Sequence, residues 1–567
     1  MSHSTLERIT SWIILTVGPA TAIFITPTVS IDPINQSKML IVATCGFAIL
    51  GLLIVNFGIV YLKIFKPFQI LLLLFFIQII LVLICSGAPF NQQFYGVSGR
   101  NTGAITYFSL VFIAAGAAFI SNFKLIERVS LSLIVCGVLS AFYGLLQTFN
   151  LDPINWSNPY NPIVGFFGNP NFQSSFYGIT AIAAFASVIG GSKKLYLRLA
   201  GCLYIFTVIF LILRSNSQQG MLVTGFGCLV VLFMYLIGNS SLAKSKVLFP
   251  FTLFSAVTSL IVLLGTLKIG PLADLLYKVS VRQRGFYWHS AIEMMQSHPF
   301  FGVGMDSFGD WYFKVRSEGA AFYTPNVMTN SAHNVFLELG AFGGYPLFLL
   351  HLALVLLTIW KITRFLQRNR RFNWAYAALV GAWIGYEAQA VISINQIGLA
   401  IWGWLLMGLL VGIEFKSRAE EEIDSKSQNP KNKSESRFER QRITKTSSSP
   451  TILAAIIGAT LALFFVVPVF NNDAQMRQAG KSQNLQIFIQ KATAKPLDSN
   501  RLVDASIILA DNNLIPQARQ LVDLALQNNP LFYNAWDLKL KLSDPNSSDY
   551  LEVKEKLNDL NPRVPQK

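Results

Sequence analysis

Long runs of apolar residues, separated by shorter polar segments, fill most of the chain as far as residue 414, and one further run follows near residue 460. A helix needs about 20 predominantly apolar residues to cross the hydrocarbon core of a bilayer. Helices also satisfy their own backbone hydrogen bonds, which lipid cannot do. The pattern therefore predicts an all-α, polytopic membrane protein with thirteen transmembrane helices, at residues 10–29, 39–62, 68–86, 104–121, 129–147, 173–191, 195–213, 219–237, 247–267, 334–360, 373–393, 396–414 and 451–470.

The composition favours a membrane-embedded chain over a set of soluble domains. Only 13% of the 567 residues are charged, against about 25% in a typical soluble protein. The first apolar run is followed by others and by no small-residue cleavage site, so we expect a membrane helix rather than a signal peptide. All five cysteines lie in apolar runs without metal-ligand spacing, and we expect neither a disulfide framework nor a metal site.

The net charge of +16 is mainly a signal of topology. Lysines and arginines gather in alternate loops, as at residues 361–371 and 416–445, and are sparse in the loops between them. Positively charged loops stay on the cytoplasmic side of a membrane. We therefore predict a cytoplasmic N-terminus, an exported C-terminus and no nucleic-acid partner.

Changes in composition divide the chain into four parts. Residues 1–414 form the predicted membrane core. Residues 415–450 are polar and poor in aromatic residues, which is typical of a disordered linker, here on the cytoplasmic side. Residues 451–470 form the last predicted span, and residues 471–567 form an exported tail.

The tail has the periodicity of helices, with Ala505, Ala518 and Ala525 among leucines and isoleucines. Pro516 stands where a helix would begin, and Asn529-Pro530 where one would end. The pattern resembles a tetratricopeptide-type unit. It suggests that the tail docks a partner protein or packs on the exported face of the core, and an ordinary helical tail is the alternative.

Function is expected in the exported loop at residues 268–333, because this loop is far longer than the others and long loops often carry function. Trp288, Ile292 and Met295 recur at helical spacing and predict an amphipathic helix that lies on the membrane surface. His298-Pro299 ends this helix, and the Gly-Val-Gly segment that follows predicts a flexible turn.

Arg282 and Arg284 lie near the start of that helix. Guanidinium groups and free backbone amides at a helix N-terminus together suit an anion such as a phosphate. Contact with lipid headgroups is the alternative. Because the loop returns to the membrane soon after its helix, we expect Arg284 to approach His333.

His333 and Asn334 stand at the end of the loop, where the span at 334–360 begins. An imidazole that titrates near neutral pH can act as a general base toward a hydroxyl group. Asn334 is placed to orient the imidazole or to hold a substrate. The alternative is that His333 is a structural residue.

Four further ionisable residues lie at the ends of spans or within them. Arg100 and Arg214 stand at exported boundaries, where an arginine either anchors the chain to lipid headgroups or binds a phosphate. Glu387 lies inside an apolar run, where an ionisable group is a functional candidate, and Glu338, shortly after His333, is similar. Hydrogen bonding within the helix bundle is the alternative for both glutamates.

Asn169, Asn171 and Gln173 lie in a segment rich in turn-forming residues that precedes a span. Their amides, at a membrane interface, are candidates for binding sugar hydroxyls. The alternative is that they stabilise a turn and the end of a helix.

Four segments together resemble the O-antigen ligase and polymerase-like superfamily, namely GFFGNPNF (165–172), RGFYW (284–288), HPFFGVGMDSF (298–308) and AHNVFLELGAFGG (332–344). The resemblance covers about residues 90–415. The ligase signature of that superfamily is matched at His333, Asn334 and Gly344 and departs at Leu347. Many members also carry Ser-Arg-Gly where this chain has residues 217–220, Ser-Gln-Gln-Gly.

The resemblance implies a metal-independent enzyme, without a cofactor, that moves a glycan from an undecaprenyl diphosphate carrier to an acceptor hydroxyl. The reaction would take place on the exported face of a bacterial cytoplasmic membrane. By motif match, Arg284 would hold the diphosphate and His333 would activate the acceptor. Whether Arg214 replaces the cation missing from the Ser-Arg-Gly segment stays open.

Ligases, protein oligosaccharyltransferases and Wzy-type polymerases are all members of this superfamily, and the sequence does not separate them. A ligase or oligosaccharyltransferase is our first expectation and a polymerase the second. A transporter, for example of inorganic carbon, is disfavoured because the chain has no convincing internal repeat. A scaffold that docks partners through the tail is the remaining alternative.

Overall fold

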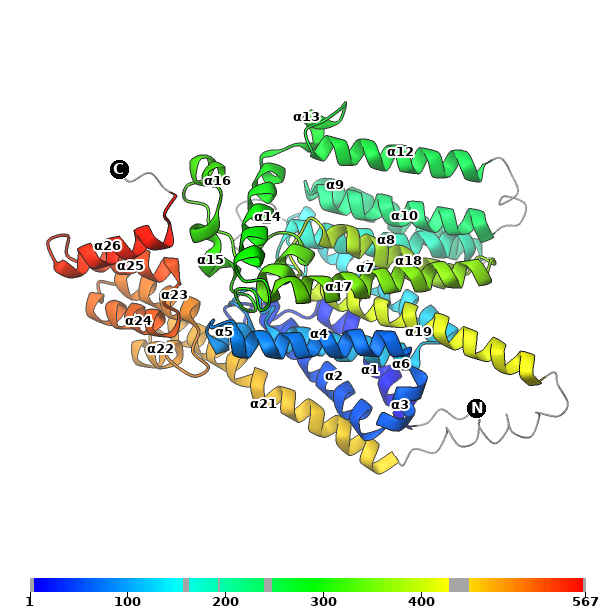
Figure 1. The fold of residues 1–567 in the computed structure, drawn as a ribbon, viewed down its shortest axis with the longest axis horizontal. Helices are drawn as coiled ribbons and strands as arrows, with labels where there is room; N and C mark the ends of the chain where they lie inside the picture. Colours follow the sequence, from blue (N-terminus) through cyan, green and yellow to red (C-terminus); the bar gives the residue numbers. More distant parts are fainter. Residues whose placement is uncertain (1–4, 157–162, 192–193, 239–246, 428–447, 564–567) are drawn as a thin grey trace.

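The computed structural model describes residues 5–156, 163–191, 194–238, 247–427 and 448–563, and the regular structure in these ranges is helical. Long helices run side by side, while the C-terminal tail and the loop between α12 (Leu248–Thr266) and α17 (Val335–Arg368) gather at one end of them (Figure 1). The expected fold class, an all-α polytopic membrane protein, is confirmed.

Each predicted span overlaps helical structure, but the span predicted at 39–62 covers two helices that meet at Asn56, and the helix in the span predicted at 10–29 ends at Ile23. Ten of the described helices are long and apolar enough to cross a membrane. α1 is not among the ten, and α6 and α18 have 17 residues each. The number and orientation of the spans stay predictions. The helices are α1 (Thr5–Ile23), α2 (Asn35–Val55), α4 (Lys66–Cys85), α6 (Ala104–Ile120), α7 (Phe123–Thr148), α8 (Pro170–Gly190), α9 (Leu195–Arg214), α10 (Gln218–Gly238), α12 (Leu248–Thr266), α17 (Val335–Arg368), α18 (Trp374–Ala390), α19 (Ile397–Ser427) and α21 (Ser448–Lys481).

Shorter helices form the connections and the tail. The connections between the long helices contain α3 (Phe57–Lys63), α5 (Phe90–Tyr95), α13 (Ala273–Leu276), α14 (Val279–Ser297), α15 (Phe308–Val315) and α16 (Glu318–Tyr323). The tail contains α22 (Leu485–Ala492), α23 (Ser499–Asp511), α24 (Ile515–Asn528), α25 (Tyr533–Leu542) and α26 (Ser548–Leu560). Pro516 lies in the first turn of α24, as expected. The tetratricopeptide resemblance stays a prediction.

α19 continues well past the predicted end of the membrane core at residue 414. It ends at Ser427, so the first part of the predicted disordered linker, 415–450, is helical. The sequence there is rich in glutamate, arginine and lysine, which are good helix formers. The next part of the predicted linker, 428–447, lies outside the described residues.

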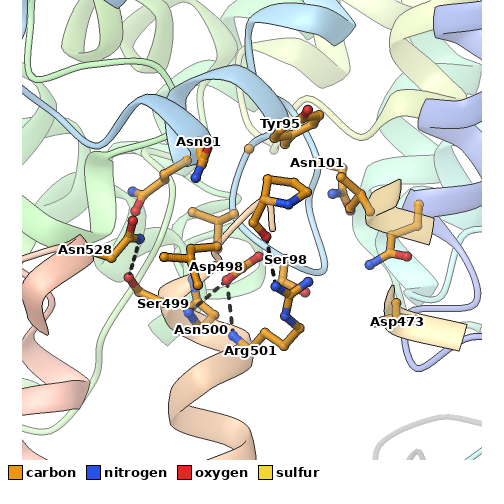
Figure 2. Close-up of a pocket in the computed structure, with 17 residues that line it drawn as sticks. Asn91, Tyr95, Ser98, Asn101, Asp473, Asp498, Ser499, Asn500, Arg501 and Asn528 are labelled. Atoms are coloured by element: carbon orange, nitrogen blue, oxygen red, sulfur yellow. Dashed lines mark hydrogen bonds between the residues drawn. The ribbon is translucent and has the colours of Figure 1, made fainter. Parts of the chain in front are cut away.

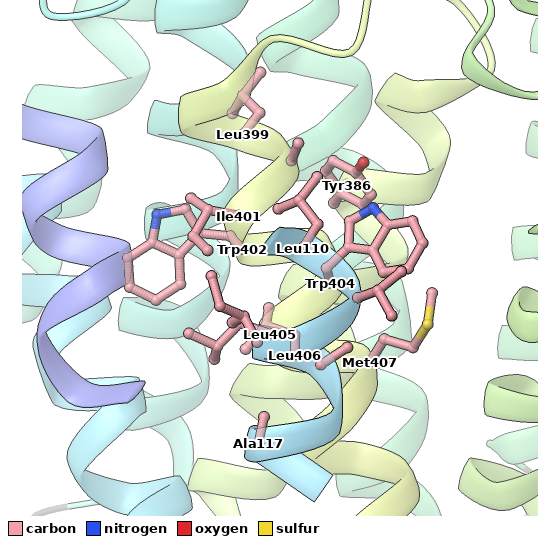
Figure 3. Packing of buried hydrophobic residues seen from close by; sticks show 14 of the residues in the cluster. Leu110, Ala117, Tyr386, Leu399, Ile401, Trp402, Trp404, Leu405, Leu406 and Met407 are labelled. Atoms are coloured by element: carbon pink, nitrogen blue, oxygen red, sulfur yellow. The ribbon is translucent and has the colours of Figure 1, made fainter. Parts of the chain in front are cut away.

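α19 and α6 form the centre of the bundle. Trp402 and Trp404 of α19 are each 1% exposed, and Figure 3 shows the α19 side chains beside Leu110 of α6. The two backbones approach closely, because a Cβ on Gly408 would lie 2.2 Å from the carbonyl oxygen of Ala114. Small residues allow such close packing between membrane helices. This contact buries α6 although the helix is short.

α17 is broken near its start, at Gly344, where φ is +70°. Residues 299–304 fill the break, and the N–H groups of Val303 and Tyr345 each donate a 2.8 Å hydrogen bond across the junction. The side-chain amide of Gln78 in α4 donates to a carbonyl of the same segment at 2.7 Å. The predicted turn is present at Gly-Val-Gly, but the segment is held between α4 and α17 rather than free of contacts.

Replacing Gly344 by alanine is expected to destabilise the protein by about 1–3 kcal/mol. The added Cβ would lie 2.4 Å from the carbonyl oxygen of Pro299, and the positive φ disfavours any L side chain. The measurement is the thermal unfolding midpoint of the purified protein. Gly225→Ala is the matched control, because its Cβ would meet no atom within 4 Å. Equal midpoints for Gly344→Ala and the control would contradict the prediction.

Candidate functional site

α14 lies across the ends of the long helices rather than along them (Figure 1). It buries Tyr287, Met294 and Met295. Of the predicted apolar stripe, Trp288 is half-buried and Ile292 is 38% exposed. The helix was expected, but its buried face is rotated by about one residue, because the face is set by packing against α17.

His333 lies in the turn before α17, and its ring faces α14. Its φ is +51°, a left-handed conformation that is uncommon for residues other than glycine. The ring stacks on that of Tyr287, with 5.4 Å between the ring centres and 29° between the planes. Within the described ranges, no hydrogen bond engages either ring nitrogen, so both are available to a substrate.

Burial, together with the positive charges of Arg284 and Arg100, lowers the pKa of His333 to about 3. The imidazole is therefore neutral at physiological pH, the form that accepts a proton. An anion bound beside Arg284 would offset the charge of that guanidinium and raise this pKa. The site can thus couple the binding of an anion to the uptake of a proton.

Arg284 lies in the second turn of α14, close enough to lower the pKa of His333. This confirms the expected approach of the two residues. Burial lowers the pKa of the guanidinium, its Nε has no hydrogen-bond partner, and no carboxylate of the described chain pairs with it. A positive charge that is withdrawn in part from water and has no counter-ion is unfavourable, and a bound anion would neutralise it.

Arg282, on the same helix, is directed toward α16. Its guanidinium carbon lies 4.6 Å from the ring centre of Tyr323, which is the geometry of a cation–π contact. Its Nε is also buried without a hydrogen-bond partner. Because an aromatic ring rather than a carboxylate holds this guanidinium, its N–H groups can bind an anion.

Asn334 has a structural contact of its own. Its side-chain oxygen accepts a 3.1 Å hydrogen bond from the N–H of Leu337 and caps the N-terminus of α17. Such a cap contributes about 1 kcal/mol to helix stability. Asn334 therefore fixes where α17 begins, directly after His333.

Arg100 differs from Arg284 because two carboxylates already balance its charge. Its guanidinium is paired with Glu338 and lies 3.5 Å from Asp306 Oδ1. It also donates to the carbonyl oxygen of Asn330. The structure therefore places Arg100 near His333, but inside a network rather than facing an open anion site.

The side-chain amides of Asn169, Asn171 and Gln173 all form hydrogen bonds within the protein, near the start of α8. Asn169 caps that helix. Gln173 is fully buried and donates to the hydroxyl of Ser140 at 2.8 Å. The oxygen of Asn171 accepts a 2.8 Å hydrogen bond from Ser217, which joins this segment to the start of α10. These contacts fit the alternative of turn and cap chemistry.

Arg214 and Glu387 are not among the residues that act electrostatically on His333. Arg214 is the exposed last residue of α9. Glu387 lies in α18 and is 9% exposed, and neither carboxylate oxygen has a hydrogen-bond partner among the described residues. The structure thus does not bring these two predicted residues to the site at His333.

Two residues that contact His333 were not selected from the sequence. Tyr287 follows Arg284 by three positions, so the two side chains project from the same face of α14, and this spacing could have indicated it. Ser331 accepts a 3.1 Å hydrogen bond from the N–H of His333. No sequence signal marks Ser331, because its contact depends on the turn at His333.

The tail packs on α15 and α5. The rings of Phe313 in α15 and Tyr533 in α25 lie 4.5 Å apart. The amide of Asn529 donates to the side chain of Gln92 in α5 at 3.0 Å, and Gln92 donates to Asp310 at 2.7 Å. Of the roles expected for the tail, packing on the core is the one observed, and a partner protein stays a prediction.

A polar pocket lies in the seam between the tail and the core (Figure 2). Its lining includes Asn91 and Asn101 from the core and Asp498 and Arg501 from the tail. The charged groups are engaged, because Asp498 caps α23 and Arg501 donates to backbone carbonyls. With about 30 Å³ of space, it has room for ordered water rather than for a sugar ring.

Replacing Tyr533 by alanine is expected to weaken the docking of the tail by about 1–2 kcal/mol, because the ring contact with Phe313 is lost. The tail should then be cleaved faster in limited proteolysis, by about 5- to 30-fold. Leu551→Ala, at a residue 67% exposed, is the control and should leave the rate unchanged. Equal cleavage rates for the two variants would argue against this mode of docking.

Comparison with known proteins assigns residues 203–352 to a family model described as O-antigen ligase. The matched range extends from within α9 into α17 and includes Arg282, Arg284 and His333. No curated protein matches the chain. The family match therefore covers the loop in which the site lies.

Proposed function

We propose that this chain, a membrane protein of the O-antigen ligase and polymerase superfamily, transfers a glycan from a lipid diphosphate carrier to an acceptor hydroxyl. The reaction would take place on the exported face of a bacterial cytoplasmic membrane. The observation that carries the proposal is the pair formed by Arg284 and His333, a half-buried guanidinium that pairs with no carboxylate of the described residues, beside a neutral imidazole.

The proposed reaction is a substitution at the anomeric carbon of the glycan. The acceptor oxygen forms a bond to that carbon, the bond from the carbon to the phosphate oxygen breaks, and the lipid diphosphate leaves with the electron pair. His333 takes the proton of the acceptor hydroxyl. Arg284, with Arg282 beside it, neutralises the charge that develops on the diphosphate through charge-assisted hydrogen bonds.

The location of the pair suits such a donor. α14 crosses the ends of the long helices, and His333 lies two residues before α17 begins at Val335. A lipid-anchored diphosphate lies at the membrane interface, whereas the acceptor hydroxyl arrives from water. Packing of α14 over the site limits the access of water and therefore competing hydrolysis.

The test is reconstitution in lipid nanodiscs with undecaprenyl diphosphate carrying a short oligosaccharide. Separate reactions would offer a glycolipid, a serine-containing peptide and a second lipid-linked oligosaccharide as acceptors. A glycosylated lipid, a glycosylated peptide or a longer lipid-linked glycan identifies a ligase, an oligosaccharyltransferase or a polymerase, respectively. No acceptor-dependent release of undecaprenyl diphosphate under any of these conditions would refute the proposal.

A further inference from the structure

A continuous set of polar contacts joins the loop after α5 to the backbone of His333. Arg100 is paired with one carboxylate oxygen of Glu338. The hydroxyl of Ser331 donates to the other oxygen of Glu338, and the same hydroxyl accepts a 3.1 Å hydrogen bond from the N–H of His333. Asp306 supplies a second carboxylate 3.5 Å from Arg100. The contacts therefore run from Arg100 through Glu338 and Ser331 to His333.

These groups are withdrawn from solvent. The side chain of Arg100 is 12% exposed, that of Glu338 is 1% exposed, and that of Asp306 is fully buried. Removing one member of a buried charged network leaves its partners without compensation, which is strongly unfavourable. The network therefore has one strongly preferred arrangement, and it holds the backbone of His333 in place through Ser331.

The backbone turn at His333, which the network holds, is strained. His333 has φ of +51°, and a residue other than glycine keeps such a conformation only where its surroundings enforce it. The bond from its N–H to Ser331 fixes one side of the turn, and the cap from Asn334 fixes the other. The result places the imidazole on Tyr287 and beside Arg284.

We propose that Glu338 and Ser331 are positioning residues for His333, and that Arg100 is the counter-ion of Glu338 rather than a ligand of the donor diphosphate. The inference rests on the proposed function for the role of His333. It gives a functional role to Glu338, a buried residue whose carboxylate does not contact the imidazole. A small displacement of a reacting group can lower a rate by about 100-fold.

Ser331→Ala removes one hydroxyl and breaks the connection, while Glu338→Gln keeps the shape of the side chain and removes its charge. Both variants are expected to lower kcat for glycan transfer by about 10- to 100-fold and to leave KM for the lipid-linked donor unchanged, because Arg284 is intact. Arg100→Lys should also lower kcat without raising this KM. Ser297→Ala, at the exposed end of α14, is the matched control and should behave as the wild type.

A second readout is independent of transfer. In Ser331→Ala the imidazole of His333 should react several-fold faster with diethyl pyrocarbonate, measured by mass spectrometry of the modified peptide, because the turn is less constrained. Wild-type kcat and wild-type modification in Ser331→Ala and Glu338→Gln would overturn the inference, as would a raised donor KM in Arg100→Lys. Should His333→Ala itself transfer glycan normally, the proposed catalytic role fails instead, and faster modification in Ser331→Ala would still support the positioning contact.

Discussion

Replacing His333 by alanine is expected to lower the rate of glycan transfer by about 10²- to 10⁴-fold, the contribution of a positioned general base. The neutral imidazole beside Arg284 is the group placed to take the proton of the acceptor hydroxyl. The measurement is the initial rate of acceptor glycosylation by purified protein in nanodiscs. Donor binding, measured separately, should change little, because Arg284 remains.

His289→Ala is the matched control for this experiment. His289 lies on α14 and is exposed, and its ring is 3.8 Å from Glu293 rather than facing the site. The control variant should transfer glycan at the wild-type rate. If His333→Ala is inserted, folded and as active as His289→Ala, the general-base assignment is wrong.

Replacing Arg284 by lysine is expected to reduce kcat/KM for the donor by about 10- to 100-fold, although the positive charge is kept. A guanidinium offers two parallel N–H donors to one phosphate group, whereas an ammonium binds as a point charge. A loss of one hydrogen bond to a charged group is worth about 1.5–3 kcal/mol. The measurement is the rate as a function of donor concentration for wild type, Arg284→Lys and Arg284→Ala.

Lys278→Ala provides the comparison that separates specific binding from general attraction. Lys278 stands at the start of α14 and is exposed, so its loss removes one positive charge without touching the buried pair. Its rate should equal that of the wild type at moderate salt, because exposed charges are screened. Full activity in Arg284→Lys would support the lipid-headgroup alternative for Arg284.

The local sequence was sufficient for the helices and their class. Whether a segment forms a helix in lipid depends on its length and apolar content, and both are properties of the segment alone. Each predicted span therefore overlaps helical structure, although the span predicted at 39–62 is divided between α2 and α3. The same reasoning missed the extension of α19 to Ser427, because the predicted linker begins with residues that also favour a helix.

The sequence was less informative about which face of an element is buried. Of the predicted stripe on α14 only Met295 is buried, whereas Trp288 is half-buried and Ile292 is exposed, because periodicity alone does not identify the partner surface. The Gly-Val-Gly segment forms the turn that its sequence predicts, but backbone contacts with α17 hold this turn in place. The face that α14 buries and the fixing of this turn both depend on contacts between segments that are distant in the chain.

For the site, motif and charge placed Arg284 and His333 in one loop, and the resemblance to the O-antigen ligase superfamily is now supported by the match at residues 203–352. The sequence alone does not show whether a carboxylate pairs with a given arginine in the folded protein. Only the tertiary structure separates Arg284, which pairs with no carboxylate of the described residues, from Arg100, which has two carboxylate partners. That difference depends on where Glu338 and Asp306 come to lie, because electrostatic compensation acts through space and not along the chain.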